Sequence, residues 1–191
     1  MTLNPNTHGG RALVGQHPTG HGKRRQSGFT LVEVALAIIV LLVGLMALSA
    51  SAVRVQGLAR AARERMTAQN AMRAKAEEIR SISRAGLSDP LGWGIHVTNA
   101  VAALATFQVE GLTPVAGQPS VGTITLVTDE TALDSTLGVE LGMPRDLDGD
   151  GLATNNAVTT TARLLPVVLE VRWTSQWGEQ KARQGLWILG Y

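Results

Sequence analysis

Three aspartates alternate along the segment RDLDGDGLATNN, which spans residues 145–156. Asp146, Asp148 and Asp150 lie two residues apart, and a glycine follows each of the last two. This spacing lets three carboxylates converge on one hard cation, and Gly151 permits the sharp turn that such a loop requires. The segment therefore predicts a calcium (Ca²⁺) site built from oxygen ligands.

The same segment begins like an EF-hand loop but does not continue as one. Aspartate occupies the first, third and fifth positions and glycine the sixth, but Ala157 stands at the twelfth, where a bidentate Glu is required. Other calcium loops use Asn or Thr ligands, and we expect Asn155 to be the fourth ligand here. The alternative is a solvated Asp-Gly turn that binds no ion.

Glu33 is a second candidate functional feature, because it is an acid at the start of an apolar run. Twenty residues without a charge separate Glu33 from Arg54. A helix of that length spans about 30 Å, the thickness of a bilayer's hydrocarbon core. An acid in such a segment is costly and is usually paired. The run predicts a membrane-inserting helix. We also expect the carboxylate of Glu33 to pair with another group.

Two other interpretations of this run remain open. The small residues of ALSASA, at 47–52, offer a cleavage site for a secretory signal, although the run is long for such a signal and Glu33 interrupts its start. An ordinary single-span anchor is the other interpretation, with Glu33 as an interfacial acid.

The helix is expected to continue beyond the membrane. Residues 54–84 are rich in Ala, Arg, Glu, Met and Gln, which favour helices, and Gly86 and Asp89-Pro90 predict its end. Apolar residues recur there at helical spacing, as in an amphipathic helix. They are Val55, Leu58, Ala62, Met66, Met72, Ile79 and Ile82.

The segment GFTLVE, at 28–33, follows three basic residues and resembles the prepilin cleavage motif of type IV pilins and type II secretion pseudopilins. The resemblance implies that prepilin peptidase cuts between Gly28 and Phe29 and that the new amine of Phe29 is methylated. It also implies that Glu33 pairs with the Phe29 amine of a neighbouring subunit and so sets axial register. The implied partners are other pilin or pseudopilin subunits, the peptidase, an inner-membrane assembly platform and the membrane itself.

Two departures from that family favour a minor pilin or pseudopilin over a major pilin. Major pilins usually carry a helix-breaking Pro where this chain has Ala50, and a C-terminal disulfide is impossible because the chain has no cysteine. The expected organisation is a leader at 1–28, a membrane or filament-core helix at 29–53, an amphipathic helix at 54–86, and a β-rich domain at 87–191. The implied location is the bacterial inner membrane with a periplasmic domain, and then a pilus or pseudopilus.

Beyond Pro90 the sequence predicts strands and loops. Strands are expected at 105–110, 121–129, 164–174 and 181–191, with a hairpin turn at Gly178. Strict alternation puts Val167, Leu169, Val171 and Trp173 on one face. We expect an α+β, pilin-like fold, with a small antiparallel sheet packed on the amphipathic half of the helix, at 54–86. Its core is expected to hold Met66, Met72 and Ile79 from the helix and Trp173 and Leu186 from the sheet.

Composition argues against catalysis and nucleic-acid binding. Residues after Gly28 carry 13 basic and 15 acidic side chains, so the basic balance of the whole chain comes from its front end. His96 is the one histidine after Gly28, on an expected loop, and no nucleophile or phosphate-binding motif stands out. We expect no enzyme; a membrane-anchored hydrolase is the least favoured class. The main alternative is an anchored or secreted calcium-binding envelope or adhesion protein that never enters a filament.

Overall fold

The computed structural model describes residues 28–190, which form two compact units that meet between Ala47 and Leu48. The leader up to residue 27, with its basic cluster Lys23, Arg24 and Arg25, lies outside the described residues, as does Tyr191. Helix α1 (Leu31–Gly86) contributes to both units. Its end at Gly86 confirms the predicted terminus.

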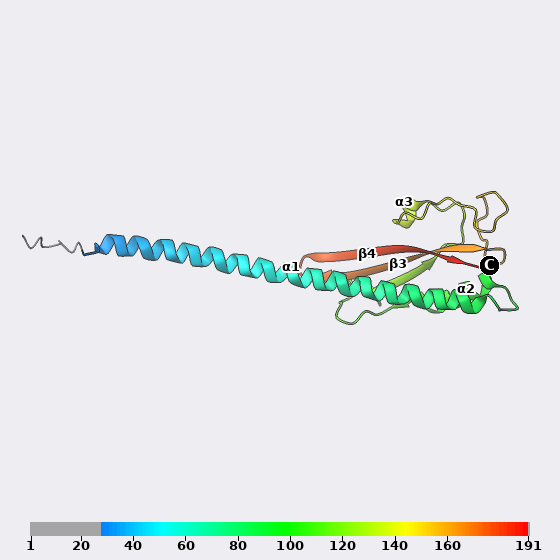
Figure 1. Ribbon diagram of the computed structural model, residues 1–191, viewed down its shortest axis with the longest axis horizontal. Helices are drawn as coiled ribbons and strands as arrows, with labels where there is room; N and C mark the ends of the chain where they lie inside the picture. Colours follow the sequence, from blue (N-terminus) through cyan, green and yellow to red (C-terminus); the bar gives the residue numbers. More distant parts are fainter. Residues whose placement is uncertain (1–27, 191) are drawn as a thin grey trace, which may run out of the picture. The chain divides into compact units, whose positions relative to one another are not determined.

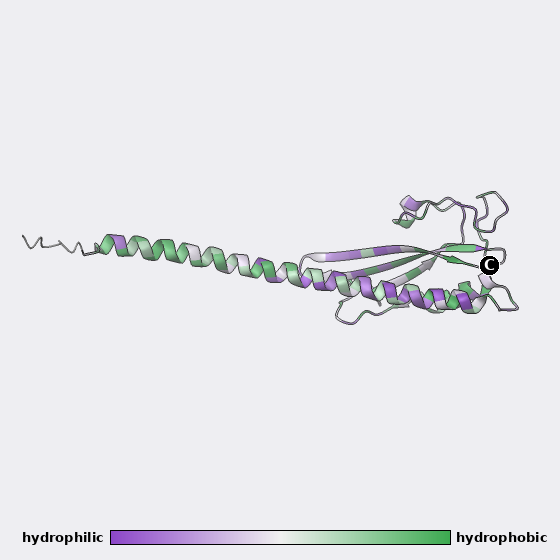
Figure 2. Ribbon diagram, in the orientation of Figure 1, coloured by the Kyte–Doolittle hydropathy of each residue, from purple (hydrophilic) through white to green (hydrophobic). Residues whose placement is uncertain are grey.

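The described part of the first unit is helical from Leu31, and every residue from Gly28 to Gln56 is exposed. One stretch of α1 is long and apolar enough to cross a membrane by length and composition. Figure 2 shows this apolar character along the N-terminal part of α1, and mixed polar and apolar residues beyond it.

In the second unit, four strands form one antiparallel sheet in the order β1-β2-β3-β4. The strands are β1 (Thr106–Phe107), β2 (Gly122–Leu126), β3 (Leu164–Ser175) and β4 (Gly178–Leu189). β3 and β4 are a long hairpin that runs beside α1 (Figure 1). The expected hairpin is confirmed, whereas β1 is only two residues long.

The core lies between one face of the sheet and one stripe of α1. Val167, Leu169, Val171 and Trp173 are 0–1% exposed, as the alternating pattern predicts. The indole Nε1 of Trp173 donates to Glu64 Oε2 at 3.2 Å, which ties the strand to the helix. The buried residues of α1 are Gly57, Ala68, Met72, Ala76, Ile79, Ser83 and Gly86.

The prediction that Met66 belongs to the core is wrong. Met66 is 62% exposed, whereas Met72, Ile79 and Leu186 are buried as predicted. The buried stripe passes through Ala68, and a residue two positions away lies about 200° around an α-helix. A small residue therefore takes the core position, and the flexible methionine lies outside it.

A second helix, α2 (Trp93–Ala103), replaces the strands and loops expected directly after Pro90. Gly94, Val97 and Val101 are its buried face, at helical spacing. The β-branched residues of this segment favour strands, and burial of that face overrides the preference. His96 therefore lies in a helix and not in a loop, with Nδ1 2.7 Å from Asp89 Oδ2. A short helix, α3 (Asp134–Leu137), follows β2.

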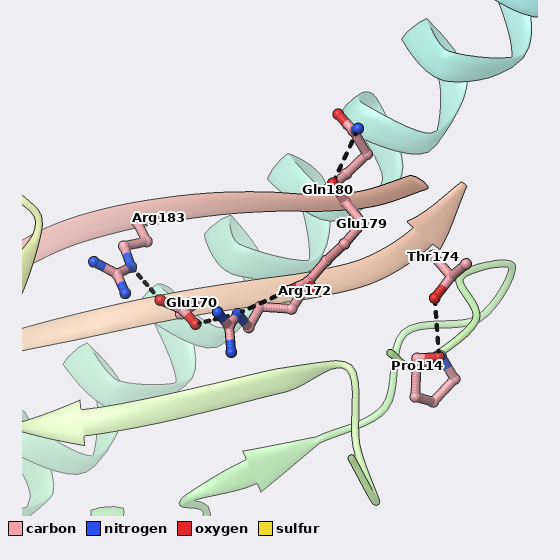
Figure 3. A network of polar contacts seen from close by, with 7 residues as sticks. All are labelled: Pro114, Glu170, Arg172, Thr174, Glu179, Gln180 and Arg183. Carbon is pink, nitrogen blue, oxygen red and sulfur yellow. Dashed lines mark hydrogen bonds and ion pairs between the residues drawn. The ribbon is translucent and has the colours of Figure 1, made fainter. Parts of the chain in front are cut away.

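The sheet's other face carries charged side chains. Glu170 on β3 bonds Arg183 on β4, and Arg172 Nε lies 3.1 Å from Glu170 Oε1 and 3.5 Å from Glu179 Oε1 (Figure 3). These pairs keep the exposed face of the hairpin polar while the opposite face is apolar.

Replacing Gly94 by Ala should destabilise the domain although alanine favours helices. A Cβ at Gly94 would collide with the backbone carbonyl oxygen of Thr159, which cannot rotate away. Overpacking of this kind costs about 1–3 kcal/mol, more than the roughly 1 kcal/mol that Ala gains over Gly. The measurement is thermal unfolding in detergent. Asn99→Ala, at an exposed position of the same helix, is the matched control and should stabilise slightly; equal gains in both variants would contradict the close contact.

Candidate functional site

The N-terminus of α1 is capped by Thr30. The backbone N–H of Glu33 donates to Thr30 Oγ1 at 3.3 Å, and that of Val34 donates to the Thr30 carbonyl at 3.2 Å. Thr and Glu three residues apart are the residue pair of a capping box, and an acid in the first turn also complements the helix dipole. Glu33 thus has a local structural role besides any role between subunits.

Glu33 shares one face of the helix with apolar residues. Phe29, Glu33, Ala37 and Leu41 are spaced four apart and, with Val34 and Ile38, line a shallow groove of about 480 Å³. Phe29 is 80% exposed. Such a continuous apolar surface is not stable in water, so it requires a bilayer or a bundle of similar helices. In either environment the carboxylate gains from a cationic partner.

The second candidate site is an acidic cluster formed by the loops before and after α3, between β2 and β3. Glu130, Asp146 and Asp148 place one carboxylate oxygen each within 4.8 Å of one another. Glu130 is fully buried: its Oε1 accepts the N–H groups of Leu147 and Asp148, at 2.7 and 3.3 Å, and its Oε2 accepts that of Asn155 at 3.0 Å. This carboxylate therefore holds both ends of the aspartate loop.

Asp146 folds the loop back on itself. Its two oxygens accept the backbone N–H groups of Gly149 and Gly151, at 2.6 and 2.8 Å. These hydrogen bonds hold the pKa of Asp146 below its ordinary value, so the group stays ionised. Gly149 and Gly151 both have positive φ, at 84° and 90°, which explains the glycines at these positions.

The other two expected ligands lie beside the cluster. The Asn155 side-chain nitrogen lies 3.3 Å from Asp148 Oδ2 and 3.4 Å from Asp150 Oδ2, so the amide bridges the two aspartates. Thr161 also donates to Asp148 Oδ2 at 3.1 Å. The atoms of this cluster that could bind a metal ion are all hard oxygens, which fit calcium or magnesium. Asn155 would have to turn its oxygen toward such an ion.

The sequence-based prediction missed two features of these sites, the Thr30 cap of α1 and the role of Glu130 in the acidic cluster. Thr30 and Glu33 carry a readable signal, because Thr-x-x-Glu before an apolar run is typical of a helix start. Glu130 carries none, since it lies 16 residues before Asp146 and only the fold brings the two together.

Comparison with known families matches residues 23–49 to the prokaryotic N-terminal methylation motif. This motif is the signature of type IV pilins and pseudopilins, and the chain carries it together with an α+β, pilin-like fold. No curated protein and no solved structure matches the chain. The motif and the apolar start of α1 together support a type IV pilin-like or pseudopilin precursor.

The same motif indicates the partners and the location of the chain in general terms. It implies contact with other pilin subunits and with prepilin peptidase, and it suggests a structural rather than an enzymatic role. A single long apolar helix near the N-terminus fits anchoring in the inner membrane with a periplasmic domain.

Proposed function

We propose that the chain is a minor pilin or pseudopilin, cleaved by prepilin peptidase between Gly28 and Phe29 and assembled into a type IV pilus or type II secretion pseudopilus. The observation that carries the proposal is the methylation motif, placed at the start of a helix whose first residues are all exposed and, apart from Glu33, apolar. The membrane stores the subunit, and the same apolar surface later packs against neighbouring helices.

In this proposal Glu33 sets the register between subunits. The methylated amine of Phe29 in one subunit pairs with the Glu33 carboxylate of the next. Both groups lie on one face of the described segment, beside apolar side chains that penalise an unpaired charge. Before assembly, the hydrogen bond from the Glu33 backbone N–H to Thr30 stabilises the start of the helix around Glu33.

The experiment is to fractionate cells of a host that makes the matching filament. Immunodetection should find the chain in sheared filaments or purified pseudopilus, at a low ratio to the major subunit. Deleting the prepilin peptidase gene should leave the chain in the membrane fraction alone. Detection only in membranes in both strains would contradict assembly and favour an anchored envelope protein.

We also propose that the acidic cluster binds calcium, with Asp146 and Asp148 as ligands, Asp150 and Asn155 completing the set, and Glu130 holding the loop. Three neighbouring carboxylates repel one another, so a divalent cation at this place stabilises the loop. The ion would supply structural rigidity and no chemistry.

Calcium should therefore raise the melting temperature of the full chain in detergent. An ion present at a hundred times its Kd stabilises a fold by about 2.7 kcal/mol. A chelator should remove the gain, and Asp148→Asn should abolish the response. Glu110→Gln changes an exposed acid outside the cluster and should respond like the parent chain. A response to calcium that survives Asp148→Asn would place the ion elsewhere.

A further inference from the structure

The turn of the β3–β4 hairpin lies beside α1 just after the uncharged run ends (Figure 1). A Cβ built on Gly57 would lie 2.5 Å from Nε2 of Gln176 and 3.1 Å from Cζ2 of Trp177, so the amide and the indole of the turn both approach the helix at a residue without a side chain. Gly57 is buried, whereas residues 48–56 and 58–60 around it are exposed. The hairpin turn thus covers one turn of α1 near the start of the second unit, which begins at Leu48.

The position of that contact along the helix corresponds to the lipid headgroups. Residues 48–53, the end of the uncharged run, belong to the same compact unit as the hairpin. Gly57 lies four residues after Val53, which is a rise of about 6 Å along the helix. Each headgroup layer of a bilayer is roughly 5–8 Å thick. Trp177 therefore lies at headgroup level when Val53 ends the hydrocarbon span.

Apolar and basic side chains are exposed at this level. Trp177, Val55 and Leu58 are 60%, 61% and 66% exposed. Arg54 is exposed and has no ion pair among residues 28–190. Tryptophan is enriched at membrane interfaces, and arginine is attracted to anionic lipids. We call Arg54, Val55, Leu58 and Trp177 the membrane-facing surface.

The two acids near this surface are already partnered. Glu179, next to the turn, lies 3.5 Å from Arg172 Nε. Glu64 lines the open groove of about 640 Å³ that continues from Leu58 and Trp177, and its oxygens are bonded to Arg60 and Trp173. Neither acid presents an uncompensated charge toward an anionic bilayer.

We propose that the membrane-facing surface docks the folded domain on the headgroups of anionic phospholipids while the subunit resides in the membrane. Trp177 inserts at the headgroup level, and Arg54 pairs with lipid phosphate. The surface continues directly from the membrane-spanning run, which is why a bilayer fits it better than another protein. The proposal needs membrane anchoring only and does not depend on assembly into a filament. Docking of this kind must be released before the subunit leaves the bilayer.

The absence of cysteine makes the test direct, because a single introduced cysteine carries a unique fluorophore. Gln176→Cys labels the hairpin turn, and Ser88→Cys labels an exposed site beyond the far end of α1. The full chain is reconstituted in vesicles of phosphatidylcholine and phosphatidylglycerol that contain headgroup-nitroxide lipid. Fluorescence at residue 176 should be quenched several-fold more than at residue 88.

Two further variants in the labelled chain assign the interaction. Trp177→Ala should reduce quenching at residue 176 several-fold with the circular dichroism spectrum unchanged. Arg54→Gln should reduce it in the mixed vesicles and have little effect in phosphatidylcholine alone. Equal quenching at residues 176 and 88 in the unsubstituted background would overturn the proposal. Quenching that vanishes when the protein is diluted in lipid would also overturn it, because the surface would then contact a neighbouring copy.

Discussion

Glu33→Ala should leave the precursor normally cleaved but reduce its amount in the filament fraction by about tenfold or more. Loss of the carboxylate leaves the Phe29 amine of the adjacent subunit unpaired among apolar helices. A tenfold change corresponds to about 1.4 kcal/mol, and breaking a buried ion pair often costs more. The measurement is quantitative immunoblotting of sheared filaments together with N-terminal processing of the membrane pool.

Glu33→Gln separates the two roles of this residue. Glutamine can serve at the third helical position of a capping box, so the helix start is retained, but the charge is lost. If register depends on charge, Gln and Ala should fail alike. Thr30→Ser keeps the capping hydroxyl and should assemble normally. Normal filament levels in Glu33→Gln would show that capping, and not pairing between subunits, is what Glu33 contributes.

Glu130→Ala should destabilise the globular domain by about 3 kcal/mol. The change removes the acceptor for three backbone N–H groups, those of Leu147, Asp148 and Asn155, in a place where the side chain is fully buried. A buried donor left without a partner costs about 1–3 kcal/mol, which applies in full to the N–H of Leu147 and in part to the partly buried N–H groups of Asp148 and Asn155. Denaturant unfolding of the full chain in detergent, followed by tryptophan fluorescence, measures the loss.

Glu130→Gln is the matched variant for that prediction. It keeps one carbonyl acceptor and the volume of the side chain, so it should cost less than Glu130→Ala. Asp129→Ala, at the preceding position, removes only two exposed hydrogen bonds, from the backbone N–H and the hydroxyl of Thr131, and should cost about 1 kcal/mol. A loss in Glu130→Ala no larger than in Asp129→Ala would mean that water replaces the carboxylate and that the loop does not depend on it.

The membrane segment and the hairpin could be predicted from sequence because each depends on a local period. Twenty uncharged residues and a strict alternation at Val167, Leu169, Val171 and Trp173 allow few other arrangements. The α2 helix was missed because its segment mixes Gly with β-branched residues, and its helical face is stabilised by contacts with distant residues. Met66 was misplaced because the core position is occupied by a small residue, Ala68, two residues further along the helix.

The acidic loop shows the same division between local and distant information. The spacing of Asp146, Asp148 and Asp150 was enough to predict a candidate cation site from sequence. The structure places the first two within one cluster. The residue that holds the loop together, Glu130, lies on the other side of α3 in sequence. No period or motif links positions that only the fold brings together.

The most direct test of the proposed function is the mass of the N-terminal peptide of the protein isolated from its native host. A peptide that begins at N-methylated Phe29 is the result that the account predicts, since it requires cleavage after Gly28 and methylation of the new amine. An N-terminus at Met1, or one near Ser51 or Val53, would contradict the account. The chain would then be an ordinary anchored or secreted domain, and its acidic loop would be the main indication of what it does.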